Sequence, residues 1–222
     1  MEYHLEFGWL ADSLVAIANG VVITVGLTVA TAILGIGVSI LGAAGRRSGR
    51  AWLRGLVAGY VELIRNTPFI VQMFFIFFGL PSLGIRFNAL AAAVLAMTVN
   101  LGAYGTEIMR AGLDAVPPGQ REAGRALGMH GASIFLLIVL PQALRNIFPA
   151  LASQIVITML ESAVVSQIAV RDLTYEADLI QSRTFRAFET YLLITFIYLA
   201  LSVALRRTLR TIGRGLLGKG VG

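Results

Sequence analysis

The sequence predicts an all-α integral membrane protein, a single domain (residues 1–222) of five transmembrane helices with one long cytoplasmic loop. Three observations predict this fold class. Hydrophobic residues make up 57% of the chain and charged residues only 14%, against roughly 45–50% and about 25% in soluble domains. The apolar residues gather in long blocks, and the net charge of +6 lies between those blocks. A net positive charge would suggest a nucleic-acid ligand in a soluble protein, but here it belongs to the loops between the membrane spans.

The first block has no charged residue between Asp12 and Arg46, which exceeds the ~20 apolar residues needed to cross a bilayer. It predicts a span over residues 13–45. The later blocks are long enough to cross with some tilt. They predict spans over residues 55–80, 87–109, 147–170 and 190–206, and within the fourth the only charge is Glu161.

The orientation follows from the basic residues, which are normally kept on the cytoplasmic side. Thirteen of them follow spans one, three and five. They are Arg46, Arg47, Arg50, Arg54, Arg110, Arg121, Arg125, Arg145, Arg206, Arg207, Arg210, Arg214 and Lys219. The opposite side has fewer arginines and more carboxylates. We therefore expect the N-terminus outside and the C-terminus in the cytoplasm.

An odd number of spans without an internal repeat argues against a transporter made of two inverted halves in one chain. A pore would need a second copy or a paralogous partner. Small residues at positions 42–45, and Gly55 with Gly59, would let helix backbones approach closely. Packing within the chain is the alternative use of these residues.

The loop from 111 to 145 alternates helix and turn signals. Val116-Pro117-Pro118-Gly119 predicts a turn, and residues 120–127 read as a short amphipathic helix ended by Gly128. A second short helix is expected from Ser133 to Leu140, stopping at Pro141. Two short helices joined by a glycine bend and tied to two spans would form a lever for a soluble partner.

The residue order in this loop resembles a known motif. Glu122-Ala123-Gly124, then Gly128, then Ile138 and Leu140-Pro141 are similar to the EAA loop of ATP-binding-cassette (ABC) importer permeases. Three further stretches resemble the polar amino-acid branch of that family, at residues 60–68, 103–110 and 118–123. Together the matches cover about residues 15–210. One departure is Gly124, where alanine is usual, which should weaken the helix by about 0.5–1 kcal/mol.

The resemblance implies a type I ABC importer permease fold in the bacterial inner membrane. It implies three kinds of protein partner, namely a cytoplasmic ABC ATPase dimer, a second permease copy or paralogue, and an outer solute-binding protein. The cargo would be an amino acid, and the chain would bind no cofactor, because the partner ATPase binds the ATP. In the family the first loop helix docks on the ATPase, which assigns this coupling role to Gln120, Glu122, Ala123, Gly124, Ala126, Leu127, Gly128 and Pro141.

Polar residues inside a bilayer are costly and indicate function. At 1.5 Å per residue, Glu161 lies ~20 Å and Thr67 ~18 Å above the cytoplasmic starts of their spans. Asn100 lies ~18 Å below the outer start of span three, and Thr24 and Thr28 ~14–20 Å below that of span one. These five residues are our candidates for the substrate pathway. The alternatives are a structural carboxyl at Glu161 and hydroxyls that bond their own helix carbonyls.

The resemblance adds weight to two of the candidates, since importers of this branch hold their amino acid near the positions matching Asn100 and Glu161. Leu160 stands where the branch usually has lysine. A carboxylate without that lysine would favour a cationic partner, which suggests a basic amino acid as one candidate substrate.

Several function classes have no support in the sequence. The chain has no phosphate-binding loop and its only lysine is Lys219, so it has no ATP site of its own. No catalytic or metal motif is present, which argues against an enzyme. Two rivals stay open: an ion- or proton-coupled secondary transporter or channel that uses Glu161, and a membrane scaffold or signalling subunit that moves no solute.

Overall fold

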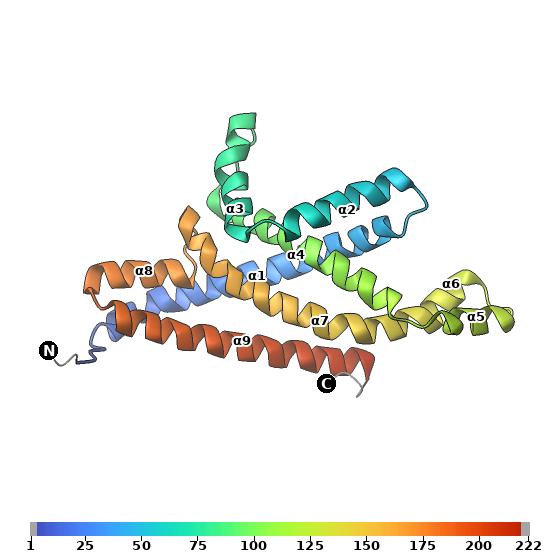
Figure 1. Cartoon of the computed structure of the whole chain (residues 1–222). Coiled ribbons are helices and arrows are strands. Elements are labelled where there is room, and N and C mark those ends of the chain that lie inside the picture. The colour runs from blue at the N-terminus through green and yellow to red at the C-terminus, as the bar shows by residue number, and fades with distance from the viewer. Residues whose placement is uncertain (1–3, 219–222) are drawn as a thin grey trace.

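The computed structural model describes residues 4–218, and that part of the chain is helical and without strands. Long helices run side by side along one axis, and a bent pair of shorter helices projects from them (Figure 1). The α-helices are α1 (Leu10–Arg46), α2 (Ala51–Arg65), α3 (Phe69–Phe74), α4 (Ala89–Asp114), α5 (Pro118–Ala126), α6 (Gly131–Ser133), α7 (Leu140–Glu161), α8 (Leu173–Thr184) and α9 (Ala187–Leu217). Four other helical turns are η1 (Phe75–Gly79), η2 (Leu80–Leu83), η3 (Ile134–Val139) and η4 (Ser162–Ile168).

The membrane spans agree with the sequence in number but not in shape. Among the described residues, four helical stretches are long and apolar enough to cross a membrane: α1, α4, α9 and the run Gly131–Ile168. The fifth predicted span, residues 55–80, is a helix pair bent by 110° between Arg65 and Phe69. The expectation of one continuous helix there was wrong, because Pro68 has no backbone N–H to donate and disfavours helical geometry at the residue before it.

Small residues join α1 and α4 at the centre of the bundle. A Cβ on Gly42 would lie 2.1 Å from the Thr106 hydroxyl, and a Cβ on Gly105 would lie 2.1 Å from that of Ser39. Side chains there would force the two backbones apart. Packing within the chain therefore accounts for Gly42, whereas Gly55 and Gly59 meet no atom within 4 Å.

The end of the loop differs from the prediction. The helix expected to stop at Pro141 instead continues from α6 through the π-helical turn η3 into α7. The missing N–H of Pro141 is accommodated by that wider turn, and the Gln142 side chain donates to the Ile138 carbonyl at 2.8 Å. The loop therefore contains one separate short helix, α5, and the start of the long helical run Gly131–Ile168, called the rod below.

The fourth span is helical to Ile168, close to its predicted end at residue 170, and the chain then folds back. After α7 and η4 the chain turns at Ala169, whose φ is +62°, and α8 then packs along α1 (Figure 1). A Cβ on Gly20 would lie 2.8 Å from the Leu173 Cα. The first turn of α8 therefore lies beside Gly20, which is ~15 Å along α1 from Leu10, the first residue of that helix. The segment between spans four and five thus starts at membrane depth rather than at the outer surface.

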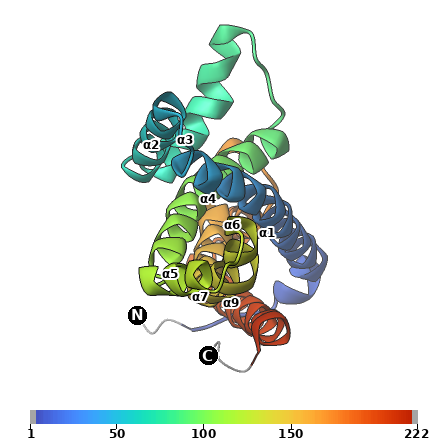
Figure 2. The ribbon, with the colours of Figure 1, turned by 90° about the vertical axis from the view of Figure 1, so that its right-hand side faces the viewer.

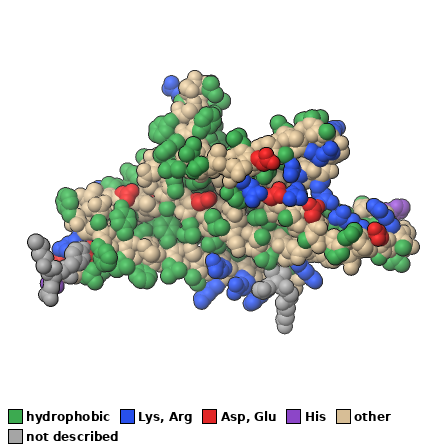
Figure 3. Space-filling model, viewed as in Figure 1, with side chains coloured by type: hydrophobic (Ala, Val, Ile, Leu, Met, Phe, Trp, Pro, Cys, Tyr) green, Lys and Arg blue, Asp and Glu red, His purple; other side chains and the backbone are tan. Residues whose placement is uncertain are grey.

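The basic residues gather at one end of the bundle, as predicted. The C-terminal ends of α1, α4 and α9 lie there with α5, and most of the blue side chains on the face drawn in Figure 3 lie in that half (Figures 1 and 3). Lys219 lies outside the described residues. Glu107 accepts from Arg110 Nε at 2.9 Å, an ion pair three residues apart on α4. The Arg65 guanidinium lies 5.3 Å from the centre of the Tyr104 ring, a cation–π contact between α2 and α4.

Candidate functional site

The bend between α2 and α3 exposes the last carbonyls of α2, which need partners. Side chains of the bend itself supply them. The Asn66 amide donates to the Glu62 carbonyl at 2.8 Å, and the Thr67 hydroxyl donates to the Leu63 carbonyl at 2.8 Å. Gln72, one turn into α3, donates to the Ile64 carbonyl at 2.7 Å. The bend is thus closed by hydrogen bonds from its own side chains and from Gln72.

Gln72 also links the bend to α4. Its amide nitrogen donates to both the carbonyl and the hydroxyl of Thr67 at 2.9 Å. Its side-chain oxygen accepts from Asn100 Nδ2 at 3.1 Å. Two of the predicted pathway residues, Thr67 and Asn100, are therefore joined through a third that the sequence analysis missed.

Asn100 provides the one open acceptor of this polar chain. Its side chain is 3% exposed, and its Oδ1 has no hydrogen-bond partner. A buried acceptor without a partner is costly, and it can accept a hydrogen bond from a donor such as an ammonium group. The arrangement therefore suits a polar ligand that approaches α4.

Glu161 is the last residue of α7 and is half-buried. Within the described residues, the carboxyl group of its side chain makes no hydrogen bond or ion pair. One turn further on, Val165 packs in one core cluster with Met73 of α3 and Met97 of α4. Met73 adjoins Gln72, and Met97 lies one turn from Asn100. The fold thus brings the turn after Glu161 into the same layer as the polar chain.

Thr24 and Thr28 lie elsewhere, in the contact between α1 and α8. The Thr24 hydroxyl accepts from the Leu173 backbone N–H at 3.1 Å, which caps the first turn of α8. The Thr28 hydroxyl donates to the Thr24 carbonyl at 2.8 Å. Their role in the pathway stays a prediction, and the structure gives both hydroxyls a partner in helix packing.

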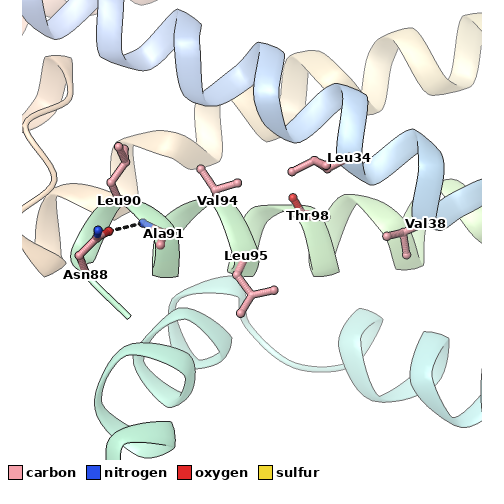
Figure 4. Close-up of a pocket in the computed structure, with 8 residues that line it drawn as sticks. All are labelled: Leu34, Val38, Asn88, Leu90, Ala91, Val94, Leu95 and Thr98. Atoms are coloured by element: carbon pink, nitrogen blue, oxygen red, sulfur yellow. Dashed lines mark hydrogen bonds between the residues drawn. The ribbon is translucent and has the colours of Figure 1, made fainter. Parts of the chain in front are cut away.

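A hollow lies on the face of α4 that is opposite to Asn100. It has a volume of about 480 Å³ and is lined by Leu34 and Val38 of α1 and by α4 residues including Thr98. Figure 4 shows Thr98 pointing toward Leu34 and Asn88 capping the start of α4 through the Ala91 N–H. Thr98 is two residues from Asn100, so the two side chains point in nearly opposite directions. This apolar hollow is therefore separate from the polar chain.

The predicted coupling residues other than Pro141 belong to α5 and the turn that follows it, at the exposed tip of the bundle (Figures 1 and 2). α5 ends in a backbone cap: the Gly128 N–H donates to the Arg125 carbonyl at 2.9 Å and the Met129 N–H to the Gly124 carbonyl at 3.0 Å. This pair of bonds is the Schellman motif, which needs a left-handed residue after the helix. Gly128 supplies it with φ of +72°, so the predicted glycine bend is present.

α5 packs against the rod through Gly124. A Cβ at this position would lie 2.9 Å from Ile134 Cγ1 and 3.1 Å from Ile138 Cδ1, which explains why this chain lacks the usual alanine. The other faces of α5 are open to solvent. Gln120, Glu122, Ala123 and Ala126 are exposed there, and Leu127 at its end is 80% exposed.

The rod connects the two parts of the site. η3, which contacts α5, is continuous with α7, and α7 ends at Glu161. The distance from Ile134 to Glu161 is ~40 Å at the helical rise. α5 and the polar layer are therefore joined by one helical element. Pro141, predicted to end a helix, lies inside this element and is exposed.

Of the residues that form the polar chain, sequence reasoning missed Gln72. Gln72 lies inside a predicted span, where an uncharged amide is also costly unless it is bonded. That signal was available, but the bend that gives Gln72 its partners was not predicted.

Comparison with known proteins gives consistent matches. Residues 35–217 match the family model described as "Binding-protein-dependent transport system inner membrane component". The chain is 37% identical over 153 residues, 69% of this chain and 71% of the other, to "Probable glutamine ABC transporter permease protein GlnM" of Bacillus subtilis. It is 34% identical to "L-cystine transport system permease protein TcyB" of the same organism, covering 82% and 78% of the two chains.

One solved structure is similar over the whole fold. A chain from "Crystal structure of an amino acid ABC transporter with histidines" superposes with a TM-score of 0.90 and 36% identity. The match covers 96% of this chain and all of the other. The bend of α2 and α3 and the protruding α5 thus belong to a fold already observed in an experimental structure.

Proposed function

This chain belongs to the binding-protein-dependent transport system inner membrane component family, and from that membership we propose how its parts divide the work of amino-acid import. It is a permease subunit of an amino-acid ABC importer and a multi-pass membrane protein. Its relatives are named as transport permeases rather than enzymes. None of them supports a secondary transporter or channel.

The pathway is proposed to run past the polar layer formed by Thr67, Gln72 and Asn100, with Glu161 beside it. The free acceptor of Asn100 and the unpaired carboxyl of Glu161 support this placement. The Asn100 Oδ1 and the Glu161 carboxylate are both hydrogen-bond acceptors, and within the described residues no group donates a hydrogen bond to either. An amino acid offers an ammonium group to such acceptors. A basic amino acid offers two, which favours that substrate class among the candidates.

α5 is proposed to receive the stroke of a separate cytoplasmic ATPase dimer. The observation that carries this part is the packing of α5 on η3 through Gly124, because η3 continues into α7 as one helix. The exposed outer face of α5 and the apolar tip of Leu127 are free for a docking partner. ATP is bound by that partner, so this chain needs no cofactor.

The assembly is proposed to contain two permease copies, or this chain and a paralogue, because an odd number of spans without an internal repeat does not form two matching halves of a transporter. The family description supports a solute-binding protein as a further partner. The arginine-rich end with α5 would face the cytoplasm, as basic residues do. The N-terminus, at the opposite end of α1, would then face outward.

The test is amino-acid uptake by proteoliposomes that hold the complete importer, ATP inside and loaded binding protein outside. Glu161→Gln is expected to reduce uptake at least tenfold while leaving membrane insertion unchanged, since it removes a charge worth more than ~1.4 kcal/mol to a cationic substrate group. Asp178→Gln, a carboxylate of α8 near the outer end, is the control and should keep uptake. Uptake without ATP, or full uptake by Glu161→Gln, would contradict the proposal.

A further inference from the structure

Two cavities meet at Arg47, at the end of α1 where the basic residues gather. The first is an apolar groove of about 470 Å³ between α1, α4 and the rod. Its walls include Ile36, Ile40 and Ala44 of α1 and Leu144 of α7. Its lining is apolar except for Arg47. A groove of this kind on a membrane helix bundle accepts hydrocarbon.

The second cavity is cationic and has a volume of about 510 Å³. Four arginines line it with a single carboxylate. The lining residues are Arg46, Arg47, Arg54, Arg110 and Asp114. Glu107 also lies near Arg46 and is bonded to Arg110. Positive charge therefore exceeds negative charge at this point.

The partners of these arginines leave room for an anion. Asp114 is shared, accepting from Arg47 at 3.0 Å and from Arg110 at 2.8 Å. Arg54 donates only to the Ser48 carbonyl. The Nε of Arg46 is buried without a hydrogen-bond partner. A guanidinium nitrogen in that position lacks an acceptor, which a phosphate oxygen can supply.

The dimensions of the groove fit one lipid leaflet. From Ile36 to Arg47 it follows α1 for ~16 Å at the helical rise. Half of the hydrocarbon core of a bilayer is about 15 Å thick. An acyl chain in the groove would therefore have its headgroup at the level of the arginines.

We propose that this paired cavity binds an anionic phospholipid, with an acyl chain in the groove and the phosphate at Arg46, Arg47 and Arg54. The charge favours this occupant over a zwitterionic lipid. It also disfavours a second copy of the chain, because a twofold contact through the groove would place these arginines against their equivalents. Only the choice of the cytoplasmic leaflet rests on the proposed orientation.

The first test counts bound lipids on the purified permease–ATPase complex by native mass spectrometry. The probes are dioleoyl phosphatidylglycerol and dioleoyl phosphatidylcholine. Phosphatidylglycerol is expected to bind at least tenfold more tightly. Arg46→Gln with Arg47→Gln should weaken its binding about thirtyfold, the effect of two basic residues at an anionic lipid surface. Arg206→Gln with Arg207→Gln, an exposed pair on α9 that lines neither cavity, is the control and should change nothing.

The second test fills the groove without changing any charge. Ala44→Phe is expected to lower phosphatidylglycerol affinity at least fivefold. Leu41→Phe is the control, since it lies on the same helix, is 73% exposed and lies outside the groove. Binding is measured without transport, so a failure here is distinct from a failure of the proposed import function.

Four outcomes overturn the proposal. The first two are equal binding of the two lipids and unchanged affinity in the arginine pair variant. The third is displacement by excess inorganic phosphate with no effect of Ala44→Phe, which would mean a free-anion site. The fourth is a disulfide between two copies carrying Leu144→Cys, which would place a second chain in the groove. The native chain has no cysteine, so that cross-link would be unambiguous.

Discussion

Two of the helix breaks in the described part of the chain are built in opposite ways. The break between α2 and α3 is closed by side chains, with Gln72 as its centre and Asn100 attached to it. The break after α5 is closed by two backbone hydrogen bonds around Gly128. The first lies within the predicted second span, while the second lies at the exposed tip.

This difference follows the surroundings of each break. In the membrane no water can bond the free carbonyls of a helix end, so polar side chains must supply the bonds, and these chains are then also available to a ligand. At the tip water is present, so a compact backbone cap is enough and leaves the outer face of α5 free for a partner. One break is thus suited to contact a solute and the other to contact a protein.

Removing the centre of the buried break should have the largest effect on stability. Gln72→Leu leaves the Ile64 carbonyl and the Asn100 amide without their partners. Each unsatisfied group costs about 1–3 kcal/mol in proteins, although side-chain bonds within membranes average nearer 0.6 kcal/mol. We expect a loss of about 2 kcal/mol in the unfolding free energy, measured by denaturant titration in micelles.

The control for that substitution is Gln167→Leu. Gln167 is exposed and makes one long hydrogen bond of 3.5 Å to Ser166. It should lose less than about 0.5 kcal/mol, as surface positions do. Equal losses at the two glutamines would show that the buried break does not depend on Gln72.

The exposed break should respond less strongly and to a different change. Gly128→Ala places a Cβ at φ of +72°, which costs about 1–2 kcal/mol in a left-handed conformation. Gly131→Ala is the matched control, because that glycine is helical and its Cβ would meet nothing within 4 Å. The same denaturant titration compares them, and a loss as large at Gly131 as at Gly128 would argue against the left-handed cap.

The smallest effect is expected where α5 meets the rod. Gly124→Ala gains helix propensity of roughly 0.8–1 kcal/mol but brings its Cβ to 2.9 Å from Ile134 and 3.1 Å from Ile138. The two terms nearly cancel, so the net change should stay below about 1 kcal/mol. In an Ile138→Val background the substitution should become more favourable, by about 0.5 kcal/mol in a double-mutant cycle. No coupling between the two positions would contradict the close contact.

Most of the fold could be predicted because local composition determines where the spans and turns lie. Uncharged blocks marked the spans, and Gly128 marked the end of α5 through its conformational freedom. The helix through Pro141 could not be predicted in this way, because a π-helical turn accommodates a proline that usually ends a helix. The turn between η4 and α8 was not predicted either. It depends on a left-handed conformation at Ala169, and alanine rarely adopts that conformation.

The site was predicted in part. Depth counting placed Asn100 and Thr67 at one level, and the structure joins them. It could not reveal Gln72, whose partners exist only because the chain bends at Pro68. The same counting placed Thr24 and Thr28 at a similar depth but carried no information on direction, and their hydroxyls face α8 or their own helix.

The central claim is that α5 and α7 move as one body between the cytoplasmic partner and the membrane interior. Since the native chain has no cysteine, spin labels can be placed at exposed Ala123 and Ser153 of the assembled importer, and their separation measured by pulsed electron resonance with and without ATP. A second pair, Ala123 with Leu56 of α2, reports whether a conformational change takes place. We predict that ATP changes the second distance and leaves the first unchanged. A change in the separation of α5 and α7 would contradict the account.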